Sequence, residues 1–189
     1  MSEHHDAVLY EIRQTVKETV NRSHRIAGPL NFDVATIHYG LGLIVCQGFL
    51  EKAMNKICEL PSSGKFPKRM KNITGKPFIQ AIDFWQYKFD PKNTWYGWRE
   101  LINFFRLADC FTKNGGTLNG KGVKVKAFRK QLESGDVKTR KKKSIEPYFD
   151  IDDQDKLKLQ CEALDRFTSI CGELIHMAEK YLRKKKRSK

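Results

Sequence analysis

The stretch from Trp95 to Gly116 constrains the fold more than any other part of the chain. It closes on Asn114-Gly115-Gly116, and glycine readily takes the left-handed conformation that ends a helix. Before that point, apolar residues recur at helical spacing. They are Trp98, Leu101, Ile102, Phe105 and Ala108. We therefore predict one amphipathic helix over residues 95–116, with an apolar face that packs against other elements.

The polar side of this helix includes Arg106, Asp109 and Lys113. Arg106 and Lys113 are seven residues apart, which is two helical turns, and Asp109 lies between them. At these spacings all three side chains point the same way. Arg106 and Lys113 are therefore candidate phosphate contacts, together with Asn114 at the helix end.

Four more helices are predicted from apolar periodicity, at residues 3–25, 33–59, 78–89 and 160–185. Two short segments, 148–151 and 157–159, are predicted to pair as a hairpin before the last helix. The predicted fold class is mostly α, a bundle of about five helices. It forms a single domain over residues 1–185, with a flexible basic insert at about 117–145 before the last helix and a basic tail at 186–189.

The second of these helices is predicted to be the core helix, with Asp33 as its N-cap. Glycine is costly inside a helix, so Gly40, Gly42 and Gly48 are expected to allow close contact with neighbouring helices. Its apolar residues form a broad face, made of Val34, Ile37, Leu41, Ile44, Val45, Phe49, Ala53, Met54 and Ile57.

Positive charge is concentrated in two segments. Residues 113–143 hold eleven Lys or Arg and two acids, a net charge of +9, and residues 180–189 hold seven and no acid. Because the whole chain carries +14, all other residues together carry −2. Such cationic appendages on a near-neutral body favour a polyanionic partner. Neither segment alternates basic with bulky apolar residues, which favours nucleic acid over an anionic membrane.

The helix over 95–116 resembles the signature of the HEPN superfamily, Arg-Asn-x-x-x-His-Asn-Gly-Gly. Phe49-Leu50-Glu51 on an early helix, the basic insert and the long last helix also resemble that family. The motif is degenerate here. Lys113 stands at the family's His, Asp109 at its Asn and Ala108 at its usual Arg, and Arg106 comes two residues too early for that Arg.

The resemblance implies a HEPN-like helical bundle, a homodimer whose motifs face one another across a cleft, and RNA as the partner. Active HEPN nucleases cut RNA without metal, using the Arg and His of the motif. This chain has no Arg followed by His after four to six residues. Lys113 is a poor substitute for the His, because Asp109 and the helix C-terminus both favour its charged form.

The predicted function is therefore nucleic-acid binding, of RNA, by a catalytically degenerate HEPN-like protein. One alternative is a divergent metal-independent endoribonuclease of a toxin or phage-defence system, with Arg106, Asp109 and Lys113 as catalytic residues or with His176 replacing the motif His. A further alternative is an interaction protein that binds an acidic protein partner, such as a cognate antitoxin. The residues predicted to contact nucleic acid are Arg106, Lys113, Asn114, Lys121, Lys124, Lys126, Arg129, Lys130, Lys138, Arg140, Lys141, Lys142 and Lys143.

No cofactor or metal is expected, because the chain has no P-loop, dinucleotide fingerprint or zinc motif. Its five cysteines form no C-x-x-C pair and are expected to be buried, reduced thiols. The aromatic residues Trp85, Trp95, Tyr96 and Trp98 are expected in the core more than in base stacking. A cytoplasmic location is expected, because no signal peptide is present and the most apolar run, Leu41 to Leu50, is too short to span a bilayer.

Overall fold

The computed structural model describes residues 2–60, 66, 77–118, 148–154 and 156–187. These residues form five helices and one hairpin, which confirms the mostly α prediction. In chain order the elements are α1 (Ser2–Ala27), α2 (Phe32–Cys58), α3 (Pro77–Phe89), α4 (Gly97–Asn114), β1 (Phe149–Ile151), β2 (Leu157–Leu159) and α6 (Cys161–Arg187). The basic insert predicted at 117–145 lies outside the described residues from 119 onward. Helix α6 continues to Arg187, so the predicted tail is helical at its start.

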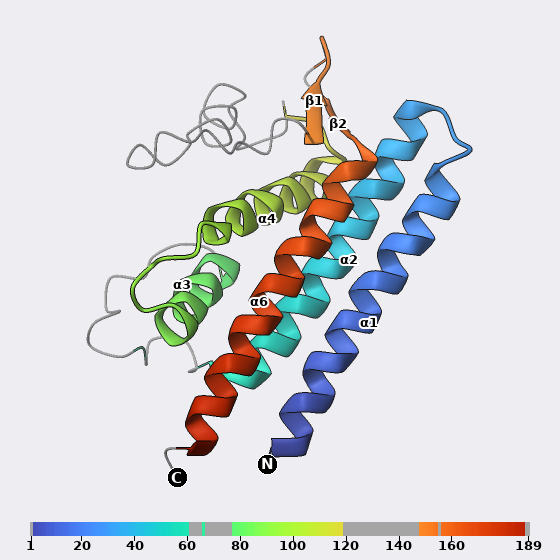
Figure 1. Ribbon diagram of the computed structural model, residues 1–189. Helices are drawn as coiled ribbons and strands as arrows, with labels where there is room; N and C mark the ends of the chain where they lie inside the picture. The colour runs from blue at the N-terminus through green and yellow to red at the C-terminus, as the bar shows by residue number, and fades with distance from the viewer. Residues whose placement is uncertain (1, 61–65, 67–76, 119–147, 155, 188–189) are drawn as a thin grey trace.

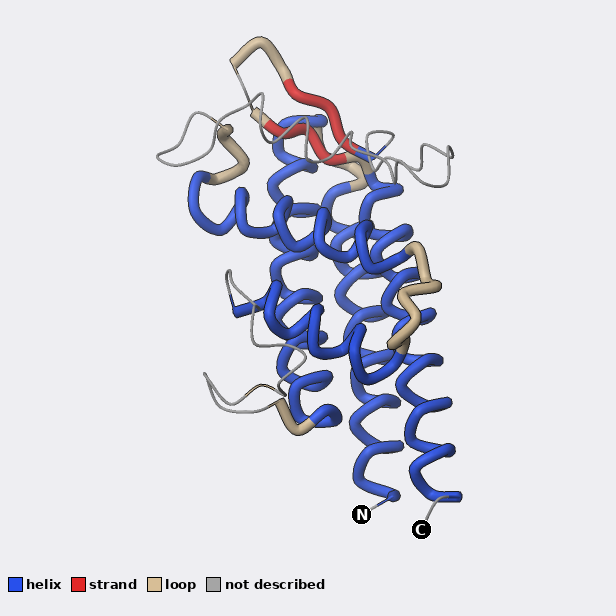
Figure 2. The backbone as a smooth tube through the Cα atoms, turned by 90° about the vertical axis from the view of Figure 1, so that its left-hand side faces the viewer, coloured by secondary structure: helices blue, strands red, loops and turns tan. Residues whose placement is uncertain are grey.

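Helices α1, α2 and α6 run side by side along the length of the molecule, with both termini at one end (Figure 1). Helices α3 and α4 pack against α2 and α6. The hairpin lies at the end opposite the termini (Figure 2). Its strands are antiparallel, with Phe149 opposite Leu159, which confirms the predicted hairpin.

Helix α2 is in contact with all four other helices, as expected for the core helix. Its inner face is completely buried at Leu43, Cys46, Leu50 and Met54. The predicted broad apolar face is wrong in one respect, because much of it is not in the core. Five of its residues are substantially exposed instead: Val34, Ile37, Leu41, Val45 and Phe49.

The N-cap of α2 is Asn31, not Asp33 as predicted. The Asn31 side chain accepts a hydrogen bond from the Val34 backbone N–H at 3.1 Å, and its backbone is extended, as an N-cap requires. Both residue types favour this position, and the helix begins one residue earlier than the pattern indicated. Asp33 lies in the first turn and pairs with Lys158 Nζ at 3.0 Å.

Two of the three α2 glycines allow close packing, as predicted. A Cβ on Gly40 would lie 2.5 Å from the Phe111 ring of α4, and the space beside Gly42 is filled by Ser23 of α1 and Leu164 of α6. The prediction is wrong for Gly48, where a Cβ would have no atom within 4 Å. Gly40 thus fixes where the C-terminal end of α4 meets α2.

A buried ion pair joins α4 to α6. Arg166 Nε and Nη2 donate to the two carboxylate oxygens of Glu100 at 2.7 and 2.9 Å. The Glu100 side chain is 7% exposed and that of Arg166 is 19% exposed. One turn away, Phe104 packs edge-on against Phe167 with ring centroids 5.4 Å apart. These contacts hold α4 at a fixed place on the bundle.

Replacing Arg166 by methionine is expected to lower the free energy of unfolding by about 3 kcal/mol, because the buried Glu100 carboxylate loses its partner. Urea denaturation measures the change. The matched control is Arg13→Met, since Arg13 forms an exposed pair with Glu179 and its loss is expected to cost under about 1 kcal/mol. Equal losses in the two variants would contradict a special role for the Glu100 pair.

Asp90 organises the connection between α3 and α4. Its carboxylate accepts hydrogen bonds from Thr94 Oγ1 at 2.8 Å, from the Trp95 backbone N–H at 2.8 Å and from Trp98 Nε1 at 3.0 Å. Burial alone would raise the pKa of Asp90, but these hydrogen bonds outweigh it and leave the pKa lowered. The ionised carboxylate therefore stabilises the start of α4.

The Asp90→Asn variant is expected to lose about 1–2 kcal/mol of unfolding free energy at neutral pH. Because the folded pKa of Asp90 is lowered, its contribution is complete above the unfolded value of about 4 and disappears as pH falls through the folded value. The difference between wild type and variant should therefore shrink in acid. Urea denaturation at neutral pH and near pH 3 tests this, and a constant difference would contradict it.

Candidate nucleic-acid interface

The partly exposed side of α4 carries a charged ridge, which we define as Arg99, Arg106, Asp109 and Lys113. The three cations are spaced seven residues apart, or about 10 Å along the helix axis. Lys113 is exposed, and the other three members are partly exposed. The apolar residues of α4 face the other way, into the core. The ridge thus presents positive charge along the whole length of the helix.

Arg106 is held at the middle of the ridge. Its Nη1 donates to Asn103 Oδ1 at 3.2 Å, and Asn103 itself is buried. Burial lowers the pKa of Arg106, and the positive charge of Arg99 lowers it further. The two guanidinium groups lie two helical turns apart on α4 and repel one another.

Lys113 and Asp109 form an ion pair of 2.7 Å between Nζ and Oδ1. They sit at i and i+4, so the predicted common orientation holds for these two residues. The hydrogen bond described for Arg106 goes to Asn103 instead. A paired lysine at a helix C-terminus keeps its proton, which suits phosphate contact better than proton transfer.

The end of α4 is closed as predicted by its glycine pair. Gly115 has φ of +58° and Gly116 has φ of +84°, and their N–H groups donate to the carbonyls of Phe111 and Cys110. The Gly116 carbonyl accepts from the Leu157 N–H at 2.9 Å, which ties this turn to β2. The Asn114 Nδ2 atom is buried without a hydrogen-bond partner in the described part of the chain. Because Nδ2 is buried, the predicted contact of Asn114 with nucleic acid is not made through this atom.

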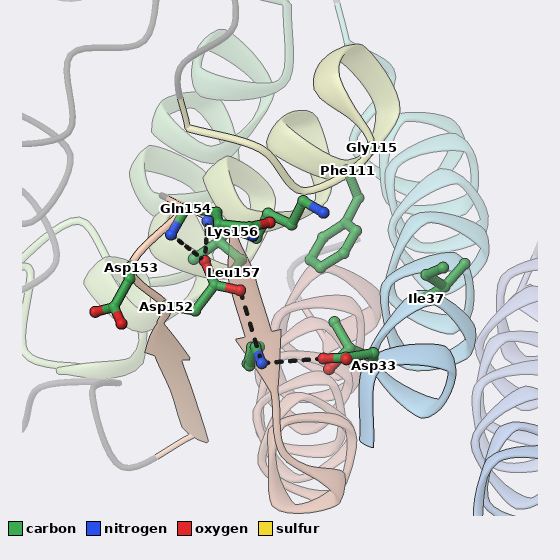
Figure 3. Close-up of a pocket in the computed structure, with 11 residues that line it drawn as sticks. Asp33, Ile37, Phe111, Gly115, Asp152, Asp153, Gln154, Lys156 and Leu157 are labelled. Atoms are coloured by element: carbon green, nitrogen blue, oxygen red, sulfur yellow. Dashed lines mark hydrogen bonds and ion pairs between the residues drawn. The ribbon is translucent and has the colours of Figure 1, made fainter. Parts of the chain in front are cut away.

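A hollow of about 420 Å³ lies between the start of α2, the end of α4 and the hairpin (Figure 3). Ile37, Phe111 and Gly115 line one part of it. Acidic side chains of the hairpin turn line another, and Lys158 bridges Asp33 and Asp152 at 3.0 and 3.6 Å. These acids make the hollow a poor site for phosphate, so the α4 ridge remains the better candidate.

Asp152 is fixed in that turn by the backbone. Its Oδ1 accepts from the N–H groups of Lys156 and Gln154, both at 2.9 Å, and these hydrogen bonds together with Lys158 lower the pKa of Asp152. The described residues hold no group of three or more His, Cys, Asp or Glu side chains suited to a metal ion.

Most of the predicted nucleic-acid contacts fall outside the described residues. These are Lys121, Lys124, Lys126, Arg129, Lys130, Lys138, Arg140, Lys141, Lys142 and Lys143. Arg99 is a ridge residue that the sequence analysis missed. Its spacing of seven residues from Arg106 is the signal that points to it.

The structure does not support His176 as a replacement for the motif histidine. His176 is exposed on α6 and lies 3.8 Å from Glu179, which itself pairs with Arg13 of α1. The α6 residues that meet α4 are others, among them Arg166 and Phe167. These contacts place His176 on the side of α6 that faces α1.

The aromatic residues near α4 are mostly structural, as predicted. Trp85 and Trp98 are buried, and Trp95 Nε1 donates to Glu173 at 2.6 Å. Tyr96 differs, since it is 53% exposed beside the start of the ridge. The Arg166 guanidinium lies 6.0 Å from its ring centroid. Tyr96 is thus the one member of this group with a ring open to solvent.

The five cysteines are free thiols, and four of them are buried as predicted, whereas Cys161 is partly exposed. Burial raises the pKa of Cys46 and Cys58 to about 12, so both stay protonated at neutral pH. These thiols belong to the core.

Helix α2 is longer than the apolar run Leu41 to Leu50 that it contains. Over Asp33–Cys58 it is long and apolar enough to cross a membrane by length and composition. The same test is passed by core helices, and 44% of the window is buried inside the bundle.

Comparison of the chain with protein-family models, with curated proteins and with solved structures finds no match. What the structure establishes is a mostly α bundle of about five helices. The HEPN resemblance rests on the sequence motif and is a proposal from here on.

Replacing Gly116 by alanine is expected to cost more unfolding free energy than replacing Gly115 by alanine. Both need positive φ, which costs a non-glycine residue about 1 kcal/mol or more. A Cβ on Gly116 would also lie 2.7 Å from the Phe111 ring, whereas Gly115 has open space. We expect Gly116→Ala to lower the unfolding free energy by about 2 kcal/mol and Gly115→Ala by about 1 kcal/mol. Urea denaturation compares them, and equal costs would contradict the close packing against Phe111.

Proposed function

We propose that this protein is a catalytically degenerate, HEPN-like RNA-binding protein. The α4 ridge and the basic segment that follows it would hold the phosphate backbone. Phosphate contacts from Lys and Arg supply most of the affinity in sequence-independent binding, so the site needs no base-reading pocket.

The α4 ridge is the observation that carries this proposal. Its three cations lie on the solvent side of one rigid helix, and the Glu100–Arg166 pair fixes that helix on the bundle. The ridge ends where the chain enters residues 113–143, which carry a net charge of +9. A rigid ridge that is followed in the sequence by a strongly cationic segment favours a polyanionic partner.

Binding without cleavage is favoured by the state of Lys113 and by the histidines. Lys113 is paired with Asp109, and His24 pairs with Asp165 on the α1–α6 side of the bundle. Lys113 is thus engaged with a carboxylate, and His24 is engaged away from the ridge. The cations of the ridge can neutralise phosphate charge, and this supports binding of RNA without its cleavage.

The ridge is expected to set the salt dependence of RNA binding. Labelled mixed RNA is titrated with full-length protein in EDTA at several salt concentrations. Changing Arg99, Arg106 and Lys113 together to glutamine should reduce the slope of log K against log salt by about 2, at about 0.7 per contact with a single strand. The matched control changes Lys17, Arg22 and Arg25 to glutamine, three exposed cations of α1 with the same total charge.

The outcomes separate the competing functions. Equal slopes for the ridge and control variants would overturn the ridge as the binding site, and no retention of RNA at low salt would overturn RNA binding. RNA cleavage in EDTA that disappears in Arg106→Ala would assign an endoribonuclease instead. Tight capture of an acidic protein that survives nuclease treatment would assign a protein partner.

Removing the acid of the ridge should have the opposite effect. Asp109→Asn frees Lys113 from its 2.7 Å ion pair and raises the net charge of the ridge. We expect RNA affinity to rise by roughly two- to fivefold at low salt and to converge with wild type at high salt. A loss of affinity would indicate that Asp109 itself is needed for the site.

A further inference from the structure

Helix α2 carries an apolar stripe that faces solvent. We define the α2 outer stripe as Val34, Ile37, Leu41, Val45 and Phe49, each between 39% and 53% exposed. In the described residues, these five make up more than half of the large apolar side chains that are exposed. A contiguous apolar stripe of this kind marks an interaction surface.

The stripe follows helical spacing, so it is one continuous surface. Its members recur every three or four residues over a length of about 22 Å. The inner face of α2 is buried against its neighbours, so the stripe lies on the opposite side of the helix. Ile26 and Leu30, 39% and 38% exposed, add apolar surface just before α2 begins.

Gly48 opens a gap at one end of the stripe. A Cβ there would have no atom within 4 Å, so this glycine serves no contact inside the bundle. Glycine in mid-helix is costly, and it gives room for a side chain from outside.

We propose that the occupant of the α2 outer stripe is the same stripe of a second copy, packed antiparallel about a two-fold axis at Leu41. In this register Leu41 faces Leu41 of the second copy, Ile37 faces Val45, and Val34 enters the gap at Gly48. In each of these three pairs the two residue numbers have the same sum. This is the condition for two antiparallel helices related by a two-fold axis. The surface is therefore complementary to itself, which an isologous interface needs.

The charges at the ends of the stripe fit the same arrangement. Asp33 lies at its N-terminal end, and the exposed Lys52 and Lys56 follow its C-terminal end. Antiparallel packing brings the acidic end of each copy beside the basic end of the other, whereas parallel packing would place like charges together. The inference does not rest on RNA binding, because it concerns a different face and is tested without RNA.

The association state of the full-length chain tests the proposal. Sedimentation velocity at micromolar concentration should show a dimer for wild type. Leu41→Glu places two carboxylates together at the axis and should raise the dimer dissociation constant by roughly 100-fold or more. The matched control is Tyr10→Glu, an exposed aromatic of α1 outside the stripe, which should stay dimeric.

Two further variants separate the interface from folding. Gly48→Leu fills only open space in the monomer and favours helix, so it should weaken the dimer while thermal stability of the monomer is retained. For the register, Leu41→Cys should cross-link to itself with a short bis-maleimide. Ile37→Cys should cross-link only when mixed with Val45→Cys, and wild type controls for the native thiols.

A monomer at the highest soluble concentration would overturn the proposal. If that monomer cosedimented with anionic lipid vesicles, the stripe would belong to a membrane contact instead. Cross-linking of Ile37→Cys alone would overturn the register with its axis at Leu41, because it requires either parallel helices or an axis close to Ile37.

Discussion

The burial of the inner face of α2 is the interaction on which the rest of the structure depends. This helix packs against every other described helix, and its buried side chains Leu43, Leu50 and Met54 are fully covered. Each contributes about 1.5–3 kcal/mol of hydrophobic stabilisation. The same helix also positions α4, because Gly40 admits the Phe111 ring at close range. The α4 ridge is therefore placed by a contact with the core helix as well as by the Glu100–Arg166 pair.

The helices could be predicted from sequence because burial and helix period are coupled. A helix that buries one face has an apolar residue every three or four positions, and this spacing located all five helices. The glycine pair located the end of α4. The rule fails for α2, which is apolar on two faces. Hydrophobicity is the same for Leu41 and Leu43, yet Leu43 is buried and Leu41 is half exposed. Only the placement of the neighbouring helices decides which of the two apolar faces of α2 is buried.

The candidate site was less predictable because it depends on pairing and not on periodicity. Sequence spacing placed Arg106, Asp109 and Lys113 on one side of α4, but it did not show that Lys113 pairs with Asp109 or that Arg106 bonds to Asn103. Side-chain partners depend on rotamers and on competing acceptors within a few ångströms. The same limit explains the N-cap of α2, where Asn31 and Asp33 are equally suitable residue types and only the chain path selects Asn31.

The two proposed surfaces would reinforce one another if both are present. A dimer carries two α4 ridges on one particle, so a polyanion long enough to reach both gains affinity without any new contact. The hollow beside α4 brings the stripe next to the end of α4, because Ile37 of the stripe and the α4 residues Phe111 and Gly115 line it together. A substitution at Ile37 would therefore also change the surroundings of the α4 end. Leu41 and Val45 do not line the hollow, so changes there separate association from the geometry of the α4 end.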